Sequence, residues 1–242
     1  MIYILLGVIV GIILNNTNKN NDKKILDRFY KLNNLKDDFD IDYDSNNRII
    51  ELTIQYQNIT NFNLLTNLSN LRTLSLTDNQ INEIPKEINK LKKLEKLYLS
   101  DNQIEIIPNE LFQLEKLQQL HLSGNRISKI DKSISNLKKL EYLYLNDNLL
   151  KEIPIPNKNI EVLSLNDNKI TQIPESIKNL SNLKELFLNS NDITTIPTFI
   201  ENLLKLEYLK LNDNNISEIP KNIFNLKNLE LLELENNNID EF

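Results

Sequence analysis

Side chains that usually carry out catalysis are scarce in this sequence. His121 is the single histidine among 242 residues, and there is no cysteine. A histidine metal cluster, a Cys–His pair and a thiolate metal site therefore cannot be assembled. The three glycines are Gly7, Gly11 and Gly124, which leaves no glycine-rich loop for a phosphate. We expect a protein that is not an enzyme and that holds no cofactor and no metal.

The charge balance argues against nucleic acid as a partner. The formal net charge is −6 and the sequence pI is about 5.1, whereas affinity for phosphates comes largely from clustered Lys and Arg. Residues 37–44 alternate acidic and apolar types and are a candidate calcium site. No glycine or terminal glutamate is placed there as an EF-hand requires, so we expect an edge strand or a solvated loop instead.

Asparagine recurs with a regularity that defines a repeat. Eight asparagines are spaced by 23, 23, 23, 20, 23, 23 and 23 residues. Each closes a segment of the form L-x-x-L-x-L-x-x-N, as in residues 94–102, and x-I-x-x-I-P usually follows. We expect these residues to form a structural ladder: Asn79, Asn102, Asn125, Asn148, Asn168, Asn191, Asn214 and Asn237.

The apolar spacing within each repeat predicts one short strand. The last two leucines of L-x-x-L-x-L are two residues apart, so they share one face and the residues between them face the other way. A strand this short cannot bury its own apolar face, but identical strands stacked side by side can. Every return path covers the same side, so the strands are parallel. Nine repeats are expected, starting at residues 49, 71, 94, 117, 140, 160, 183, 206 and 229.

This pattern resembles the leucine-rich-repeat family over residues 49–242, in particular the 23-residue class of Ras-binding scaffolds, plant Ras-group proteins and many bacterial repeat proteins. The resemblance implies an α/β leucine-rich-repeat solenoid curved like a horseshoe. A parallel sheet would line its concave face, and irregular, 3₁₀ or short helical segments its convex side. It also implies that the ladder asparagines are buried and hydrogen-bond loop backbone along the stack.

Outward positions of the expected strands carry an aromatic cluster between the third and eighth repeats. Tyr and Phe are enriched at the cores of protein interfaces, so this cluster predicts a protein partner on the concave face. The alternative is that exposed aromatic residues only support their neighbours across the sheet. The candidate partner-binding residues are Tyr98, His121, Tyr142, Tyr144, Phe187 and Tyr208.

Aspartate often precedes the ladder asparagine. Such a residue commonly stabilises its turn through a local backbone hydrogen bond, and the alternative is that the column attracts a basic partner. The column comprises Asp78, Asp101, Asp147, Asp167 and Asp213.

The function expected from these features is that of an interaction module or adaptor. Two alternatives stay open: an exported surface or effector-type repeat protein that binds a host or extracellular ligand, and a repeat subunit of an enzyme complex with no catalysis of its own. The oligomeric state is left open.

The start of the chain is apolar. Ile2–Leu14 carries no charge, and its length as a helix, roughly 20 Å, falls short of the roughly 30 Å hydrocarbon core of a membrane. It is interpreted as a signal or membrane anchor in a membrane-associated or exported protein. The alternative is a cytoplasmic protein in which the segment packs on the solenoid. The expected divisions are residues 1–14 for this segment, 15–24 for a polar linker, 25–48 for an N-terminal cap and 49–242 for the repeats.

Ahead of the repeats, Asp22 is expected to cap a short amphipathic helix. Ile25, Leu26, Phe29 and Leu32 recur at helical spacing and would share one face. That face would cover the exposed N-terminal end of the repeat core.

Three repeats depart from the pattern. The first has Gln57 where asparagine belongs and Phe62 where isoleucine-proline would sit, as terminal repeats often do. The fourth has Asp131 in place of proline. The repeat at residues 140–159 is three residues short and lacks its last two apolar positions. We expect a more extended return path there and a change of local curvature.

Overall fold

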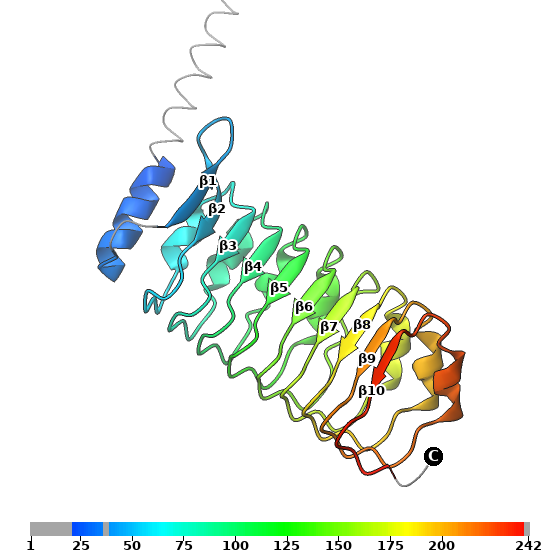
Figure 1. Cartoon of the computed structure of the whole chain (residues 1–242). Coiled ribbons are helices and arrows are strands. Elements are labelled where there is room, and N and C mark those ends of the chain that lie inside the picture. Colours follow the sequence, from blue (N-terminus) through cyan, green and yellow to red (C-terminus); the bar gives the residue numbers. More distant parts are fainter. Residues whose placement is uncertain (1–20, 36–38, 240–242) are drawn as a thin grey trace, which may run out of the picture.

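One ten-stranded sheet extends from residue 40 to residue 233. The computed structural model describes residues 21–35 and 39–239, and its strands follow one another in sequence order from β1 to β10 (Figure 1). β1 (Asp40–Tyr43) pairs antiparallel with β2 (Ile49–Thr53), and every later pair is parallel. β2 to β10 are therefore the nine parallel strands that the repeats predict. β1 is the edge strand, one of the two alternatives for the acidic run.

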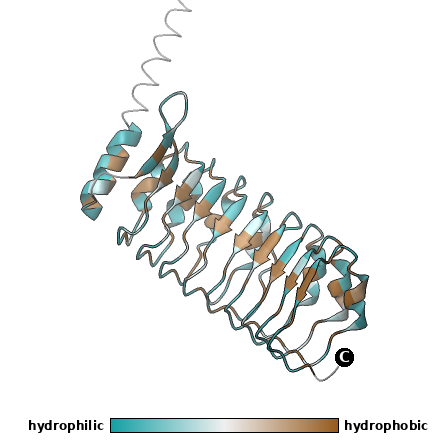
Figure 2. Cartoon of the chain, in the orientation of Figure 1, coloured by the Kyte–Doolittle hydropathy of each residue, from teal (hydrophilic) through white to brown (hydrophobic). Residues whose placement is uncertain are grey.

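The remaining strands are three residues long and lie in exact repeat register. Leu97 at the centre of β4 pairs with Leu74 before it and Leu120 after it, and all three are fully buried. Figure 2 shows apolar residues recurring on successive strands. The strands are β3 (Thr73–Ser75), β4 (Lys96–Tyr98), β5 (Gln119–His121), β6 (Tyr142–Tyr144), β7 (Val162–Ser164), β8 (Glu185–Phe187), β9 (Tyr208–Lys210) and β10 (Leu231–Glu233).

Short 3₁₀ helices form the opposite side of the solenoid (Figure 1). In four of them the residue before the helix is a proline in extended conformation, and an isoleucine such as Ile88 or Ile177 enters the core. In the fourth repeat the Asp131 carboxylate replaces the proline by accepting the Ser133 N–H at 2.8 Å. The helices are η1 (Asn63–Asn67), η2 (Lys86–Lys90), η3 (Leu111–Gln113), η4 (Lys132–Asn136), η5 (Glu175–Asn179), η6 (Thr198–Asn202) and η7 (Lys221–Asn225).

The short repeat has the extended return path that its sequence predicts. Between β6 and β7 the chain makes turns and no 3₁₀ helix forms in residues 145–161, all of which are described. Buried Asn157 occupies the interior there, and its amide donates to the carbonyls of Leu137 and Leu140. A polar side chain thus ties the short repeat to its predecessor.

A helix over residues 21–33 covers the N-terminal end of the core, with Leu26 and Phe29 buried. The prediction that Asp22 caps this helix is wrong, because residues 21 and 22 are already helical. Leu32 was expected on the apolar face, but its side chain is 67% exposed, because the buried face of the helix follows Asp22, Leu26 and Phe29.

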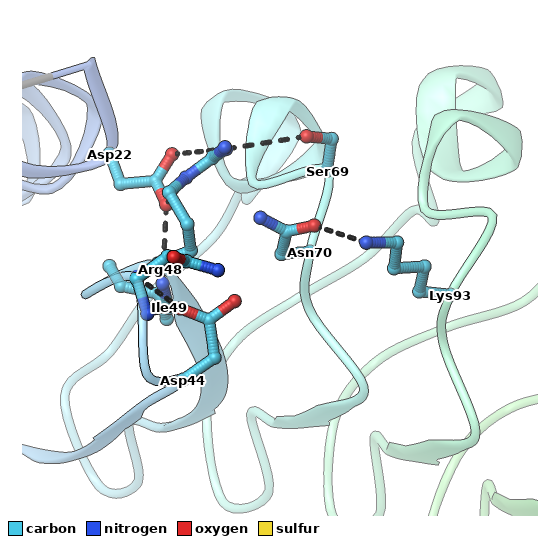
Figure 3. A network of polar contacts seen from close by, with 8 residues as sticks. Asp22, Asp44, Arg48, Ile49, Ser69, Asn70 and Lys93 are labelled. Atoms are coloured by element: carbon cyan, nitrogen blue, oxygen red, sulfur yellow. Dashed lines mark hydrogen bonds and ion pairs between the residues drawn. The ribbon is translucent and has the colours of Figure 1, made fainter. Parts of the chain in front are cut away.

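Asp22 instead joins the helix to the first repeat (Figure 3). Its buried carboxylate accepts Arg48 Nε at 2.8 Å, Arg48 Nη2 at 3.1 Å and the Ile49 N–H at 3.2 Å. A buried carboxylate is stable only when it is paired and hydrogen-bonded in this way. The pair therefore fixes the helix against the start of β2.

The apolar segment at residues 2–14 lies outside the described residues. Within residues 21–35 and 39–239, no helix has both the length and the apolar character needed to cross a membrane.

Candidate recognition surface on the sheet

The outward side chains of β2 to β10 line up in a row that we call the central column. Strand pairing places each member directly beside the next, because equivalent positions of neighbouring repeats pair in register. The central column comprises Thr53, Ser75, Tyr98, His121, Tyr144, Ser164, Phe187, Lys210 and Glu233.

Three predicted residues form a continuous aromatic stack in this column. The ring centroids of Tyr98 and His121 are 4.6 Å apart, and those of His121 and Tyr144 are 4.3 Å apart. Neighbouring strands lie about 4.8 Å apart, which brings equivalent rings to stacking distance. The Tyr98 hydroxyl donates to Gln119 Oε1 at 2.7 Å. The three rings are thus held in a fixed arrangement on the sheet.

Partial burial sets the charge of the stack. It lowers the pKa of His121 to about 4, so the imidazole is neutral at pH 7. Burial also raises the pKa of the Tyr98 and Tyr144 hydroxyls, with smaller contributions from Glu51 and Glu185 respectively. The stack is therefore uncharged at neutral pH.

Phe187 lies two strands beyond Tyr144, with the buried Ser164 between them. Lys210 Nζ lies 5.7 Å from the centre of the Phe187 ring and 3.0 Å from the Glu233 carboxylate. A cation over an aromatic face is stabilised by the ring quadrupole. This end of the central column therefore pairs a ring, an ammonium group and a carboxylate.

Tyr142 and Tyr208 lie outside the central column. Each stands two residues earlier on its strand, β6 and β9, and the Tyr208 hydroxyl donates to Glu230 at 2.8 Å. The structure thus stacks three of the six predicted residues. Tyr142 flanks that stack, and Phe187 and Tyr208 stand apart.

The ladder asparagines bind backbone, as Asn125 illustrates. Its Oδ1 accepts the Ile104 N–H at 2.9 Å, and its Nδ2 donates to the carbonyls of Leu99, Leu122 and Ser123 at 3.0 to 3.2 Å. The other seven asparagines make equivalent bonds, although Asn168 and Asn237 are only partly buried. These side chains hold the turn after each strand to the preceding repeat.

Backbone conformation explains the aspartate column. All five aspartates have positive φ, between 50° and 55°, and Gly124 at the equivalent position has φ 64°. Aspartate, asparagine and glycine tolerate this left-handed conformation better than most residues. Burial raises the pKa of Asp101, and the charges of Asp78 and Asp147 raise it further.

A second asparagine row, which we did not predict, lies at the end of the later strands. The side-chain oxygen of Asn146 accepts the Asn166 N–H at 2.9 Å. In the same way, the side-chain oxygens of Asn166, Asn189 and Asn212 each accept a backbone N–H from the next repeat. Its signal in the sequence is a second asparagine two residues before the ladder asparagine. This row stiffens the edge of the surface next to the central column.

A hollow among the loops lies apart from the central column. Ile84, Pro85, Ile106, Pro108 and Arg126 are among its lining residues. Across residues 21–35 and 39–239, no three His, Cys, Asp or Glu side chains converge in a way that could hold a metal ion.

A parallel sheet wound through one repeated turn, with an asparagine ladder beside it, defines a solenoid repeat protein. Family models described as a leucine-rich repeat region, leucine-rich repeats in two copies and a single leucine-rich repeat match residues 45–155, 158–202 and 205–226. The chain belongs to the leucine-rich-repeat family. This fold and family are those of protein–protein interaction modules, which are typically not catalytic. No curated protein matches the sequence.

Solved structures support the same assignment. A leucine-rich-repeat protein of Leptospira interrogans is 36% identical with a TM-score of 0.72, over 76% of this chain and 48% of that one. Internalin C2 of Listeria monocytogenes is 28% identical with a TM-score of 0.70, over 77% and 80%. The ectodomain of the Arabidopsis thaliana receptor kinase GASSHO1/SCHENGEN3, solved in complex with CASPARIAN STRIP INTEGRITY FACTOR 2, is 27% identical with a TM-score of 0.68, over 82% and 28%. The chain spans about half of the Leptospira protein and less of the plant receptor.

Proposed function

We propose that this chain is a non-catalytic adaptor that binds a protein partner on the exposed face of its sheet. The observation that carries the proposal is the stack of Tyr98, His121 and Tyr144, whose rings remain partly exposed. The fold does not require aromatic residues in this column, because Thr53, Ser75 and Ser164 occupy equivalent positions in other repeats. A rigid, half-exposed aromatic row is suited to the core of an interface.

Phe187, Tyr142 and Tyr208 extend the proposed site. Phe187 continues the central column, and the two tyrosines stand beside it on β6 and β9. Aromatic anchors of this kind contribute most when neighbouring contacts exclude water from them. The partner is therefore expected to cover β4 to β9.

Site-specific crosslinking in the native cell tests the location of the site. A photoreactive benzoylphenylalanine replaces Tyr144 in one variant and Phe224 in the other. Phe224 is the matched control, because it is an aromatic residue 81% exposed on η7, on the opposite side of the solenoid. We expect a crosslinked partner from position 144 and none from position 224. Crosslinking at 224 alone would contradict the proposal.

Two further possibilities concern the setting of the same surface. An exported protein would yield a crosslinked host or extracellular ligand, and a repeat subunit of an enzyme complex would yield a catalytic subunit. Identification of the crosslinked partner by mass spectrometry distinguishes them.

The apolar run Ile2–Leu14 is proposed to attach the chain to a membrane or to direct its export. Cell fractionation of the full chain and of a variant without residues 2–14 tests this. The full chain is expected in the membrane or outside the cell, and the shortened chain in the cytosol. Recovery of all the full-length protein in the cytosol would contradict attachment and export.

A further inference from the structure

We infer that the partner presents lysine or arginine side chains to the sheet, as a basic extended segment. This inference rests on the proposed function, because it names the chemistry of the partner at the same surface. We define the sheet face as five positions in each repeat, which in the third repeat are Glu95, Lys96, Tyr98, Ser100 and Asp101.

Carboxylates dominate the sheet face. The whole chain has 34 acidic and 28 basic residues, which is close to balance, but the basic residues of the sheet face are only Arg72, Lys96, Lys184 and Lys210. The acidic residues of the sheet face are Glu51, Asp78, Glu95, Asp101, Glu141, Asp147, Glu161, Asp167, Glu185, Glu207, Asp213, Glu230, Glu233 and Glu235.

The few cations of this face are partly neutralised within the protein. Lys184 Nζ lies 2.9 Å from Glu161 Oε2, and Lys210 Nζ lies 3.0 Å from Glu233 Oε1. The negative charges of the carboxylates also act on the aromatic residues, since Glu51 and Glu185 contribute to the raised pKa values of Tyr98 and Tyr144 respectively. A partner approaching the stack therefore meets a negative potential, which attracts cations and repels anions.

The chain itself shows how this surface holds an ammonium group. Lys210 Nζ lies 5.7 Å from the centre of the Phe187 ring while Glu233 binds it from the side. Asn212 Nδ2 donates to Glu233 Oε2 at 2.8 Å and so holds the carboxylate in place. Ring, ammonium and carboxylate form one unit within the central column.

The stack of Tyr98, His121 and Tyr144 also combines aromatic rings with the charges of surrounding carboxylates. Among the described residues, no Lys or Arg lies over these three rings. Glu141 and Asp147 lie on the same repeat as Tyr144, and Glu185 lies on β8. His121 is neutral at pH 7, so it does not repel an incoming cation. A lysine or arginine of the partner completes the arrangement that Lys210 completes at Phe187.

The dimensions favour an extended segment. From β4, which carries Tyr98, to β8, which carries Phe187, there are four strand spacings, or about 19 Å. An extended chain of about six residues covers that distance. An acidic or nucleic-acid partner would face like charges over the same length, and a wholly apolar one would bury carboxylates without partners.

Fluorescence anisotropy with defined peptides tests the inference. The probe is a labelled peptide of about twelve residues in which lysine alternates with glycine and serine. The comparison peptides carry glutamine or glutamate in place of every lysine. We expect the lysine peptide to bind at least tenfold more tightly than either, with an affinity that falls as salt is added.

Variants of the full chain distinguish the contribution of the Tyr144 ring to peptide affinity from that of the neighbouring carboxylates. Tyr144→Leu is expected to weaken binding of the lysine peptide about tenfold. Tyr144→Phe is expected to keep most of the affinity, because a phenyl face still attracts a cation. Glu141→Gln with Glu185→Gln is expected to weaken it several-fold. The matched charge control is Glu83→Gln with Glu105→Gln, in the loops away from the sheet face, which is expected to change affinity less than twofold. Circular dichroism and thermal melting confirm that each variant is folded.

Two results would overturn the inference. One is equal binding of the lysine and glutamine peptides. The other is binding of the lysine peptide that none of the sheet-face variants weakens. A glutamate or glutamine peptide that binds and is lost in Tyr144→Leu would overturn the basic partner while upholding the proposed function. Crosslinking from position 144 to a lysine- or arginine-rich segment of the natural partner would support both.

Discussion

The two faces of the sheet share one backbone and differ in how their side chains vary. On the inward face the central strand residue is leucine in every repeat from Leu52 to Leu209, and each of these leucines is fully buried. On the outward face the neighbouring residue changes from Thr53 through Tyr98, His121 and Phe187 to Glu233. Repetition is required where repeats pack on one another, and the other face is free to vary. Stability and recognition should therefore respond to different substitutions.

Adjacent residues of β5 provide the sharpest contrast. Leu120→Ala is expected to cost about 3 kcal/mol in the free energy of unfolding, because it opens a cavity in the stack. His121→Ala removes two ring contacts from the outward face and is expected to cost about 1 kcal/mol. Urea unfolding followed by circular dichroism measures both. Equal costs would mean that the aromatic stack is part of the core.

The two asparagine rows extend the comparison to polar groups. Asn125→Ala leaves buried backbone groups without partners and is expected to cost about 2 to 3 kcal/mol. Asn189→Ala, in the partly exposed second row, is expected to cost about 1 kcal/mol or less, since water can replace its bond to the Asn212 N–H. Equal losses in urea unfolding would place both rows in the core.

Gly124 tests whether the backbone dictates the residue at the aspartate column. Its φ is 64°, and a Cβ there would lie 2.3 Å from Asp101 Oδ1. Gly124→Ala is expected to cost about 1 to 2 kcal/mol from the left-handed conformation and the clash. In a chain that already carries Asp101→Ala, the same substitution should cost less, because the carboxylate is gone. Thermal unfolding of the single and double variants measures the coupling, and additive costs would exclude the clash.

His121 gives an effect on stability that depends on pH. Its pKa is about 4 in the folded chain against 6.5 ordinarily, so the unfolded chain binds more protons between these values. The part of the free energy of unfolding that is linked to His121 is therefore fully present above pH 6.5 and is lost as the pH falls toward 4. His121→Phe should lack this part of the pH dependence. Urea unfolding of both proteins at pH 7 and pH 5 checks it, and an unchanged difference between them would mean that His121 titrates normally.

Periodic features of the structure were predictable, and single contacts were not. The nine parallel strands and the extended turn of the short repeat follow from spacing, because each repeat imposes the same packing. The 3₁₀ side was one of the forms that the resemblance to the leucine-rich-repeat family implied. Asp22 binds Arg48, 26 residues away, and no local pattern signals that pair. The left-handed conformation of Asp101 depends on backbone geometry that spacing does not reveal. The second asparagine row has a spacing signal, but the bonds that it makes between repeats depend on the contacts of the folded chain.

The candidate site was predictable only in part. Alternation identified the outward positions, but the contacts within them depend on which strands are neighbours. Tyr98, His121 and Tyr144 stack because three successive repeats carry rings, while Ser164 interrupts the row before Phe187.

Separation of recognition from stability is tested most directly by one variant, Tyr144→Ala with Phe187→Ala. Capture of the natural partner from its own cell and urea unfolding are measured on the same protein, with Phe224→Ala as the control. We expect capture to fall at least tenfold while the free energy of unfolding stays within about 2 kcal/mol of the parent. The control should leave capture unchanged. Undiminished capture by the folded double variant would contradict the assignment of this face as the binding surface.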